Sequence, residues 1–158
     1  MNDPKPEIIQ KLNETRAELL AFLRRLDEAQ WETAVYSEGE TWTAADVVRH
    51  LVNAESGMTG LIVQWQMGND PVPPDFDLAR FNKSVVARAK NKTPAELLAE
   101  METNRANLLQ VIDGLEEDDW QKNGRHASRQ ILTIEQTCRL IADHEATHLQ
   151  DLQAGLGA

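Results

Sequence analysis

The chain has 158 residues, which predicts one domain over residues 1–158 with a core of its own. Its net charge of −10 and 16 scattered basic residues argue against a nucleic-acid or anionic-membrane partner, and no apolar run approaches the ~20 residues that cross a bilayer. Cys138 is the only cysteine, so an intrachain disulfide and a thiolate-rich zinc site are excluded and a cytoplasmic location is expected.

Four segments have the periodicity of amphipathic helices. In chain order they run from about Pro6 to Glu28, about Ala44 to Met67, Pro94 to about Leu115 and about Ile134 to Leu152. Thr93 and Thr133 begin capping boxes, and Thr43 begins a weaker one. No segment alternates for long enough to indicate a strand. The sequence therefore predicts an all-α protein.

A long connection separates the second and third helices. It runs from Gly68 to Lys92 and begins with the chain breakers Gly68-Asn69-Asp70-Pro71. It is long enough to run back along the bundle, with a short helix near Leu78–Ala89. We therefore expect a four-helix bundle in the order up-down-down-up, with one long crossover between helices two and three.

A faint internal repeat relates the two halves of the chain, because Leu12–Trp31 resembles Met101–Trp120. The matched pairs are Arg16/Arg105, Ala17/Ala106, Leu19/Leu108, Leu20/Leu109, Leu26/Leu115, Glu28/Glu117 and Trp31/Trp120, followed after one residue of slippage by Thr43/Thr133 and Glu55/Glu145. One interpretation is a helix–loop–helix unit used twice, each unit forming an antiparallel hairpin. The other is that two similar amphipathic helices align by chance.

Three histidines are expected to point into the core. His144 and His148 lie one turn apart on the fourth helix, and His50 lies on the apolar stripe of the second. Because these helices run antiparallel, the three imidazoles reach the same level. Burying unpaired imidazoles costs free energy, so we predict a divalent metal ion between them, with open positions for water or substrate. Hydrogen-bonded core histidines are the alternative. His126, in a polar loop, is expected to be solvated.

The run from His144 to His148 also matches the H-E-x-x-H motif of zinc proteases. Such a protease needs a third ligand, usually downstream, but only ten residues follow His148 and they contain no His or Glu. We therefore reject a peptidase. Glu145 remains a candidate catalytic base that orients a metal-bound water, unless it only binds solvent at the edge of the core. Cys138 is expected to pack in the core and not to act as a nucleophile.

Three segments resemble the DinB-like superfamily, the metalloenzymes of the DinB/YfiT type. They are Trp42–Leu51, Asp77–Asn82 and Asp143–Leu152. His50 and the H-x-x-x-H pair of His144 and His148 match the three histidines of the family. The resemblance covers nearly the whole chain. It implies a four-helix bundle, zinc or nickel held by these histidines, and a homodimer.

The resemblance also implies chemistry, because relatives include S-transferases that use a low-molecular-weight thiol such as bacillithiol, and mycothiol-dependent maleylpyruvate isomerases. We therefore expect a thiol-dependent S-transferase of detoxification type that acts on a small molecule, with a metal ion that lowers the pKa of the thiol. A hydrolase that uses metal-bound water and a non-catalytic bundle that sequesters a small molecule remain alternatives. Asp46 and Asn53 flank His50 on its helix, and either could orient an imidazole, although helix capping explains Asp46 equally well.

Overall fold

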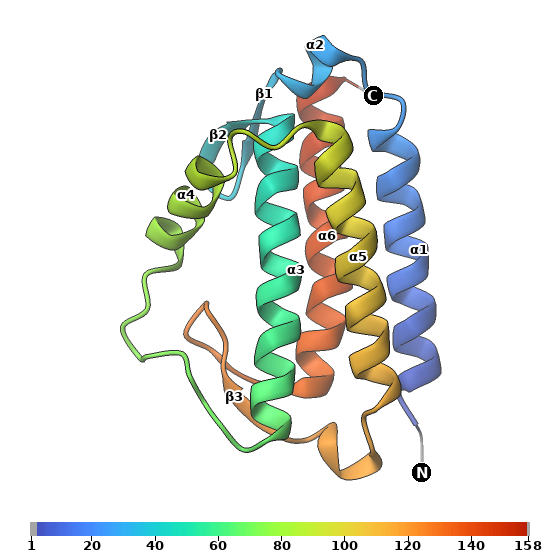
Figure 1. Ribbon diagram of the computed structural model, residues 1–158, viewed down its shortest axis with the longest axis vertical. Helices are drawn as coiled ribbons and strands as arrows, with labels where there is room; N and C mark the ends of the chain where they lie inside the picture. The colour runs from blue at the N-terminus through green and yellow to red at the C-terminus, as the bar shows by residue number, and fades with distance from the viewer. Residues whose placement is uncertain (1–2, 158) are drawn as a thin grey trace.

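A computed structural model describes residues 3–157 of the chain. Four long helices form a bundle, and they are α1 (Lys5–Leu23), α3 (Ala44–Gln66), α5 (Pro94–Asp113) and α6 (Ile134–Leu156). In Figure 1 α1 and α6 run upward while α3 and α5 run downward. The predicted up-down-down-up order is therefore confirmed. Within residues 3–157, no helix carries an apolar stretch long enough to span a bilayer.

The helix starts follow the predicted caps. The hydroxyls of Thr43, Thr93 and Thr133 each accept from a backbone N–H three residues later, and the side chain at that later position binds the threonine N–H in return. The first helix ends earlier than expected. After it, Asp27 begins a separate capping box for the one-turn helix α2 (Glu28–Trp31).

Two short hairpins were not predicted. Strand β1 (Ala34–Ser37) pairs with β2 (Glu40–Thr43), and β3 (Asn123–Arg125) pairs with β4 (Ile131–Thr133), both antiparallel. Strands of this length are too short to show alternation in a sequence. Each hairpin ends at the threonine that caps the next long helix. A 3-10 turn, η1 (Glu117–Asp119), precedes the second hairpin.

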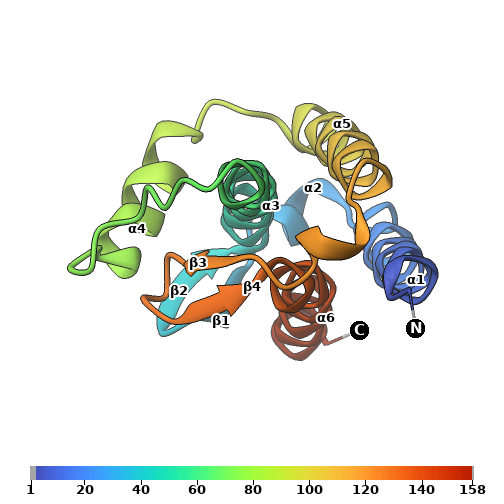
Figure 2. The same cartoon turned by 90° about the horizontal axis from the view of Figure 1, so that it is seen from below.

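The crossover contains α4 (Leu78–Arg88), close to the predicted short helix, and Figure 2 shows it lying outside the bundle beside α3. Arg49 on α3 holds its C-terminal end by donating to the carbonyl oxygens of Ala89, Lys90 and Lys92. The carboxylate of Asp46 pairs with Arg49 and Lys90. Asp46 therefore caps α3 and anchors the crossover, so capping, and not the orientation of an imidazole, is the alternative that the structure supports.

The two halves of the chain interlock. Seen end-on in Figure 2, α1 lies diagonally opposite α3 and α5 lies diagonally opposite α6, while α1 packs against α6 and α3 packs against α5. The two helices of each unit are antiparallel, as expected, but they lie on a diagonal of the bundle and each packs against helices of the other unit. The repeat itself has structural support: Ala44 N–H donates to the Thr33 carbonyl at 3.0 Å, and its counterpart Ile134 N–H donates to that of Lys122 at 2.8 Å.

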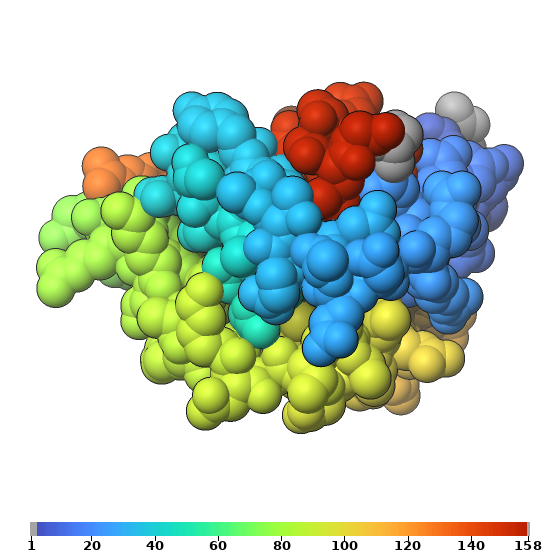
Figure 3. Space-filling model, turned by 90° about the horizontal axis from the view of Figure 1, so that it is seen from above, coloured from blue at the N-terminus to red at the C-terminus, as the bar shows by residue number. Residues whose placement is uncertain are grey.

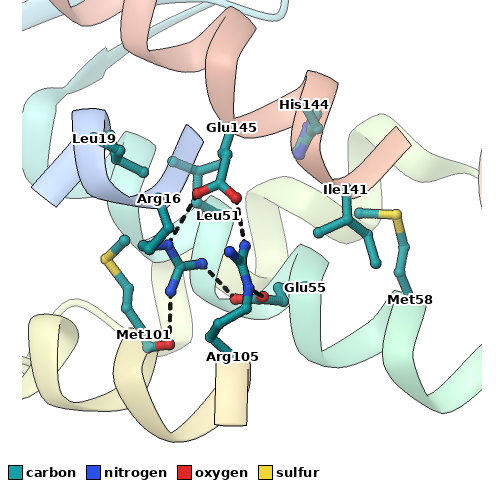
Figure 4. Close-up of a pocket in the computed structure, with 10 residues that line it drawn as sticks. All are labelled: Arg16, Leu19, Leu51, Glu55, Met58, Met101, Arg105, Ile141, His144 and Glu145. Atoms are coloured by element: carbon teal, nitrogen blue, oxygen red, sulfur yellow. Dashed lines mark hydrogen bonds and ion pairs between the residues drawn. The ribbon is translucent and has the colours of Figure 1, made fainter. Parts of the chain in front are cut away.

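A cluster of four charged side chains, here called the ionic cluster, lies in the middle of the bundle (Figure 4). Arg16, Glu55, Arg105 and Glu145 come from α1, α3, α5 and α6 respectively. Arg16 donates to Glu55 at 2.7 Å and to Glu145 at 2.9 Å. Arg105 likewise donates to both, at 2.6 Å to Glu55. All four side chains are at most 11% exposed, so their charges must neutralise one another.

The ionic cluster obeys a pseudo-twofold symmetry. Arg16 donates a further hydrogen bond to the Met101 carbonyl at 2.8 Å, and Arg105 donates one to the Leu12 carbonyl at 2.7 Å. Leu12 and Met101 are counterparts in the repeat, as are the two arginines. The cluster separates two apolar parts of the core, one around Trp42 and one containing Trp65. The repeat is therefore expressed in three dimensions, and the helix–loop–helix unit is used twice.

Candidate metal centre

Three imidazoles and one carboxylate converge where α3 and α6 meet the β1–β2 hairpin. Figure 1 shows this hairpin near the upper end of the bundle. His50 comes from α3, His144 and His148 come from α6, and Glu38 comes from the turn of the hairpin. Figure 3 shows the chain from α2 through this hairpin lying across the middle of that end of the molecule, between the end of α6 in red and the start of α5 in yellow-green. The structure thus brings the three predicted histidines together and adds Glu38. We call these four residues the His/Glu cluster.

The spacing of the four side chains suits a divalent ion. The Nε2 atom of His144 lies 3.0 Å from Nε2 of His148 and 3.3 Å from Nε2 of His50. Oε1 of Glu38 lies 2.9 Å from Nε2 of His144, 2.9 Å from that of His148 and 3.3 Å from that of His50. Ligands placed tetrahedrally around zinc are about 3.3 Å apart. The donor set and its spacing therefore fit the predicted ion.

Glu38 was missed at the sequence level. It forms a two-residue turn with Gly39, and both have a positive φ, 50° and 76°. Tight hairpins need this conformation, but they favour Asn, Asp or Gly for it. Glutamate there stores strain of about 1–3 kcal/mol, and such strain is found mainly at functional positions. The only sequence signal was a Glu-Gly pair between strands too short to recognise.

Ser37 fixes the protonation of His148. The Ser37 hydroxyl lies 2.7 Å from a carboxylate oxygen of Asp151 and 2.8 Å from Nδ1 of His148. A carboxylate only accepts, so the hydroxyl proton goes to Asp151 and the hydroxyl oxygen accepts from Nδ1–H of His148. The Nε2 lone pair of His148 therefore faces the His/Glu cluster, which is the orientation a metal ligand needs.

The electrostatics of the cluster call for a cation. With its proton on Nδ1, neutral His148 presents a lone pair to the Glu38 oxygen, and two acceptors at that distance repel each other. Burial by itself would raise the pKa of Glu38, but hydrogen bonds donated by His144, His148 and His50 in their protonated forms outweigh it and lower that pKa well below its usual range. The carboxylate is therefore ionised, and a divalent ion would satisfy all four ligand atoms.

A cavity of about 500 Å³ lies beside the His/Glu cluster. Glu38, His50 and His144 contribute to its wall, and it extends along α3 as far as Leu61. Most of the remaining wall is apolar and comes from α3, α6 and the crossover. A concave, mostly apolar site next to a group of convergent polar side chains is the usual setting of a small-molecule site.

Glu145 faces away from this centre. One of its carboxylate oxygens accepts from Arg16 and the other from Arg105, and the residue is 3% exposed. Figure 4 shows the Glu145 carboxylate directed at the two arginines, with the His144 ring set apart from it. Neighbouring residues on a helix point about 100° apart, so turning His144 to the His/Glu cluster turns Glu145 into the bundle. Glu145, which was predicted to act as a base beside the metal, therefore has Arg16 and Arg105 as its partners.

The remaining predictions have mixed outcomes. His126 is not solvated: it is 9% exposed and contributes to the wall of the cavity. Cys138 is fully buried, as expected, and burial raises the pKa of its thiol to about 12. Trp42 packs on the His50 ring with centroids 5.4 Å apart. Asn53 lines the cavity, and no hydrogen bond to an imidazole is seen for it within residues 3–157.

Comparison with known proteins places the chain among four-helix bundles. The family model of the DinB superfamily matches residues 11–152. The solved structure of TT2238, a four-helix bundle protein, is 26% identical over 95% of this chain and 98% of that chain, with a TM-score of 0.66. No curated protein sequence matches.

Two further solved structures share the fold. YfiT from Bacillus subtilis, described as a probable metal-dependent hydrolase, is 21% identical over 97% of this chain and 87% of that chain, with a TM-score of 0.76. A mycothiol-dependent maleylpyruvate isomerase is 18% identical, with a TM-score of 0.79. The match covers 95% of this chain but only 61% of the isomerase.

Proposed function

Because this chain belongs to the DinB superfamily, we propose that it is a divalent-metal-dependent enzyme that transfers a small thiol to an electrophilic small molecule. One observation carries the proposal: Glu38 converges with three histidines beside an apolar cavity. Within the described residues that line the cavity, Glu38 is the only carboxylate.

The proposed ion, zinc or nickel, is held by His50, His144, His148 and Glu38. Such an ion, when bound, lowers the pKa of a thiol or a water molecule and so supplies a nucleophile at neutral pH. The side chain of Glu38 is 34% exposed, whereas those of His50 and His148 are 5% and 1% exposed. Four protein ligands fill a tetrahedral site, so one of them must give way to the nucleophile, and Glu38 is the ligand that a thiol or water in the cavity reaches most easily.

The surroundings of Glu145 favour a thiol over water as the nucleophile. A thiol has a pKa of about 8.5, against about 15.7 for water, so it needs less help from a base. Both oxygens of Glu145 accept from arginines, which leaves it unsuited to take a proton in the cavity. We therefore propose a structural role for Glu145 in place of the catalytic one.

Neighbouring side chains hold the histidines in place. Ser37 and Asp151 fix the ring orientation and the tautomer of His148. Trp42 packs against His50 and covers it from solvent. These contacts preorganise the His/Glu cluster without taking part in the chemistry.

Elemental analysis of protein made without a polyhistidine tag tests the metal. We expect about one divalent ion per chain in the wild type and a large loss in His50→Ala and His148→Ala. His126→Ala is the matched control, because His126 lies outside the His/Glu cluster and should leave the metal content unchanged. Equal, sub-stoichiometric metal in wild type and His50→Ala would refute the metal centre.

A conjugation assay tests the reaction. The metal-loaded protein is mixed with a chlorodinitrobenzene and one of several thiols, including bacillithiol, mycothiol and glutathione. In the reaction a carbon–sulfur bond forms, the carbon–chlorine bond breaks, and chloride and the thiol proton are released. Conjugation should exceed that of His144→Ala for at least one thiol. A rate no higher than that variant with every thiol would rule out S-transfer to this electrophile class.

A hydrolase is the second candidate. Glu38 favours it, because a carboxylate within hydrogen-bond distance of three imidazoles could accept a proton from water. A reaction that needs no thiol and is lost in Glu38→Gln, with the metal retained, would favour hydrolysis. Ligand binding without turnover would instead favour a sequestering role.

We also propose a homodimer in the cytoplasm. The family resemblance supports the first, and the single buried, reduced Cys138 is compatible with the second. Light scattering of the purified protein and fractionation of cells check these two points.

A further inference from the structure

The cavity has a second wall that follows from the internal repeat. Counting from the matching N-caps Thr43 and Thr133, each histidine of the His/Glu cluster has a counterpart in the other half of the chain. The pairs are His50/Leu140, His144/Ala54 and His148/Met58. All three apolar counterparts line the cavity. The cavity therefore extends from the His/Glu cluster to the apolar counterpart of that cluster.

The hairpins extend the correspondence. When the strands are aligned from Thr43 and Thr133, the counterpart of Ser37 is His126. His126 N–H donates to the Gln130 carbonyl at 2.8 Å, which continues the pairing of the second hairpin by one residue. Ser37 of the first hairpin belongs to a hydrogen-bonded relay of three side chains, Asp151, Ser37 and the predicted metal ligand His148. The counterpart of that relay consists of His126 and two apolar side chains, Met58 and Leu61. His126 is thus a polar group facing a largely apolar wall.

The loop after β3 sets the tautomer of His126. Backbone N–H of Ser128 donates to Nδ1 of His126 at 3.1 Å, and the Ser128 hydroxyl lies 2.9 Å from the same atom. The neutral ring therefore carries its proton on Nε2. Burial, followed by repulsion from His144, lowers the pKa of His126, so the ring is neutral at pH 7. Within residues 3–157 the structure shows no hydrogen bond from Nε2, which leaves this donor available to a ligand.

Away from the His/Glu cluster, the charged groups around the cavity select against an anionic ligand. Its described lining contains no lysine or arginine, and its one carboxylate, Glu38, belongs to the His/Glu cluster. An anionic group bound at the His126 end of the cavity, away from the ion proposed at the His/Glu cluster, would therefore lose hydration without gaining a cationic side chain, which costs free energy. The net charge of −10 also repels anions from the protein as a whole.

We propose that the cavity binds a neutral, largely apolar small molecule with one hydrogen-bond acceptor, such as an ester, ketone or amide oxygen. His126 Nε2–H donates to this oxygen, and the apolar body packs against Met58, Leu61 and Leu140. The inference rests on the proposed function in one respect, because it takes this molecule to be the electrophilic substrate. Binding can be measured without turnover, so the two ideas can be tested separately.

Three probes with a common naphthalene body test the inference on the protein as purified. A methyl naphthoate is neutral and has an acceptor, a methylnaphthalene is neutral and has none, and a naphthalenesulfonate is an anion that coordinates metal ions weakly. Isothermal titration should show the ester binding about 3- to 10-fold more tightly than the hydrocarbon, as one added hydrogen bond predicts. The sulfonate should bind most weakly. An ester that does not bind, or a sulfonate that binds as tightly, overturns the proposal.

Two variants test the role of His126. His126→Phe keeps a ring in the loop but removes the donor, and His126→Ala removes both. Each should weaken the ester by about 3- to 10-fold and leave the hydrocarbon within about twofold. Equal weakening of both probes, or of neither, in a variant that remains folded by circular dichroism would contradict the hydrogen bond. Metal content is measured in the same samples. Wild-type protein that contains no metal refutes the metal centre. Probe affinities in another order than predicted, in protein that contains the metal, refute only this inference.

Discussion

The two helix–hairpin–helix units of the bundle agree at its centre and differ at its ends. At the centre, each unit contributes one arginine and one glutamate, with matching hydrogen bonds. At one end the units supply the His/Glu cluster, and at the counterpart positions they supply Leu140, Ala54 and Met58. The comparison teaches that the positions that hold the fold keep the pseudo-symmetry, whereas those that we assign to chemistry break it.

Electrostatics explains the difference. Two buried guanidinium groups and two buried carboxylates balance, so losing one member leaves an uncompensated charge in the core. The ionic cluster therefore restricts both units equally. The walls of the cavity need no such balance of charge, because neutral imidazole, methyl and thioether groups can each be accommodated there. Four predictions test this comparison, from the largest expected effect to the smallest.

The first concerns the two glutamates of the ionic cluster. Glu55→Gln and Glu145→Gln should each lower the free energy of unfolding by about 3–5 kcal/mol, because either change leaves a buried arginine charge unbalanced. Urea denaturation of the two variants measures the loss. The pseudo-symmetry predicts that the two losses agree within about 1 kcal/mol.

The same pair separates structure from catalysis. If Glu145 acts only within the ionic cluster, both variants should retain the metal at temperatures where they are folded. A rate loss seen in Glu145→Gln alone, at full folding and full metal content, would restore Glu145 as a catalytic base.

The second prediction concerns two glycines at matching contacts. A Cβ on Gly124 would lie 2.0 Å from Nε1 of the buried Trp65, whereas one on Gly155 would lie 3.0 Å from a methyl of Val35. Gly124→Ala should therefore cost about 3 kcal/mol through overpacking. Gly155→Ala should cost less than about 1 kcal/mol, because alanine also improves the helix propensity. Thermal unfolding of both variants decides, and equal losses would refute the asymmetry.

The third prediction compares the counterparts Ser37 and His126. Ser37→Ala removes the hydroxyl that orients His148, so metal affinity should fall by about 10- to 100-fold. His126→Ala should leave metal affinity unchanged, because its ring contacts no member of the relay. Competition with a chelator of known affinity measures both variants. Unchanged affinity in Ser37→Ala would show that the tautomer of His148 is held in another way.

The fourth prediction concerns Cys138, whose counterpart in α3 is Val48, and both are fully buried. Because burial raises the pKa of the thiol to about 12, only about 10⁻⁴ of it is thiolate at pH 8. The folded protein should therefore react with an aromatic disulfide reagent far more slowly than the protein in urea. Cys138→Val should change stability by less than about 1.5 kcal/mol and leave thiol transfer intact. Loss of transfer would implicate the thiol.

The sequence alone determined much of the fold. The 3.6-residue period located the four long helices, and the threonine caps marked where three of them begin, because both are local effects. The end of the first helix was predicted too late. The same period turned His144 and His148 to one face and placed His50 level with them. The repeated arginines and glutamates also marked the pseudo-symmetry before their contacts were seen.

Only the tertiary structure decided the rest. Glu38 reaches the histidines through a strained two-residue turn between strands too short to have a periodic signal. His126 is buried because a distant crossover packs near its loop, where Arg129 donates to the Phe76 carbonyl at 2.7 Å. Glu145 contacts two arginines because the two helices of each unit lie on a diagonal of the bundle, which brings α1 and α5 next to each other. These outcomes depend on contacts between residues far apart in the chain, which local periodicity does not encode.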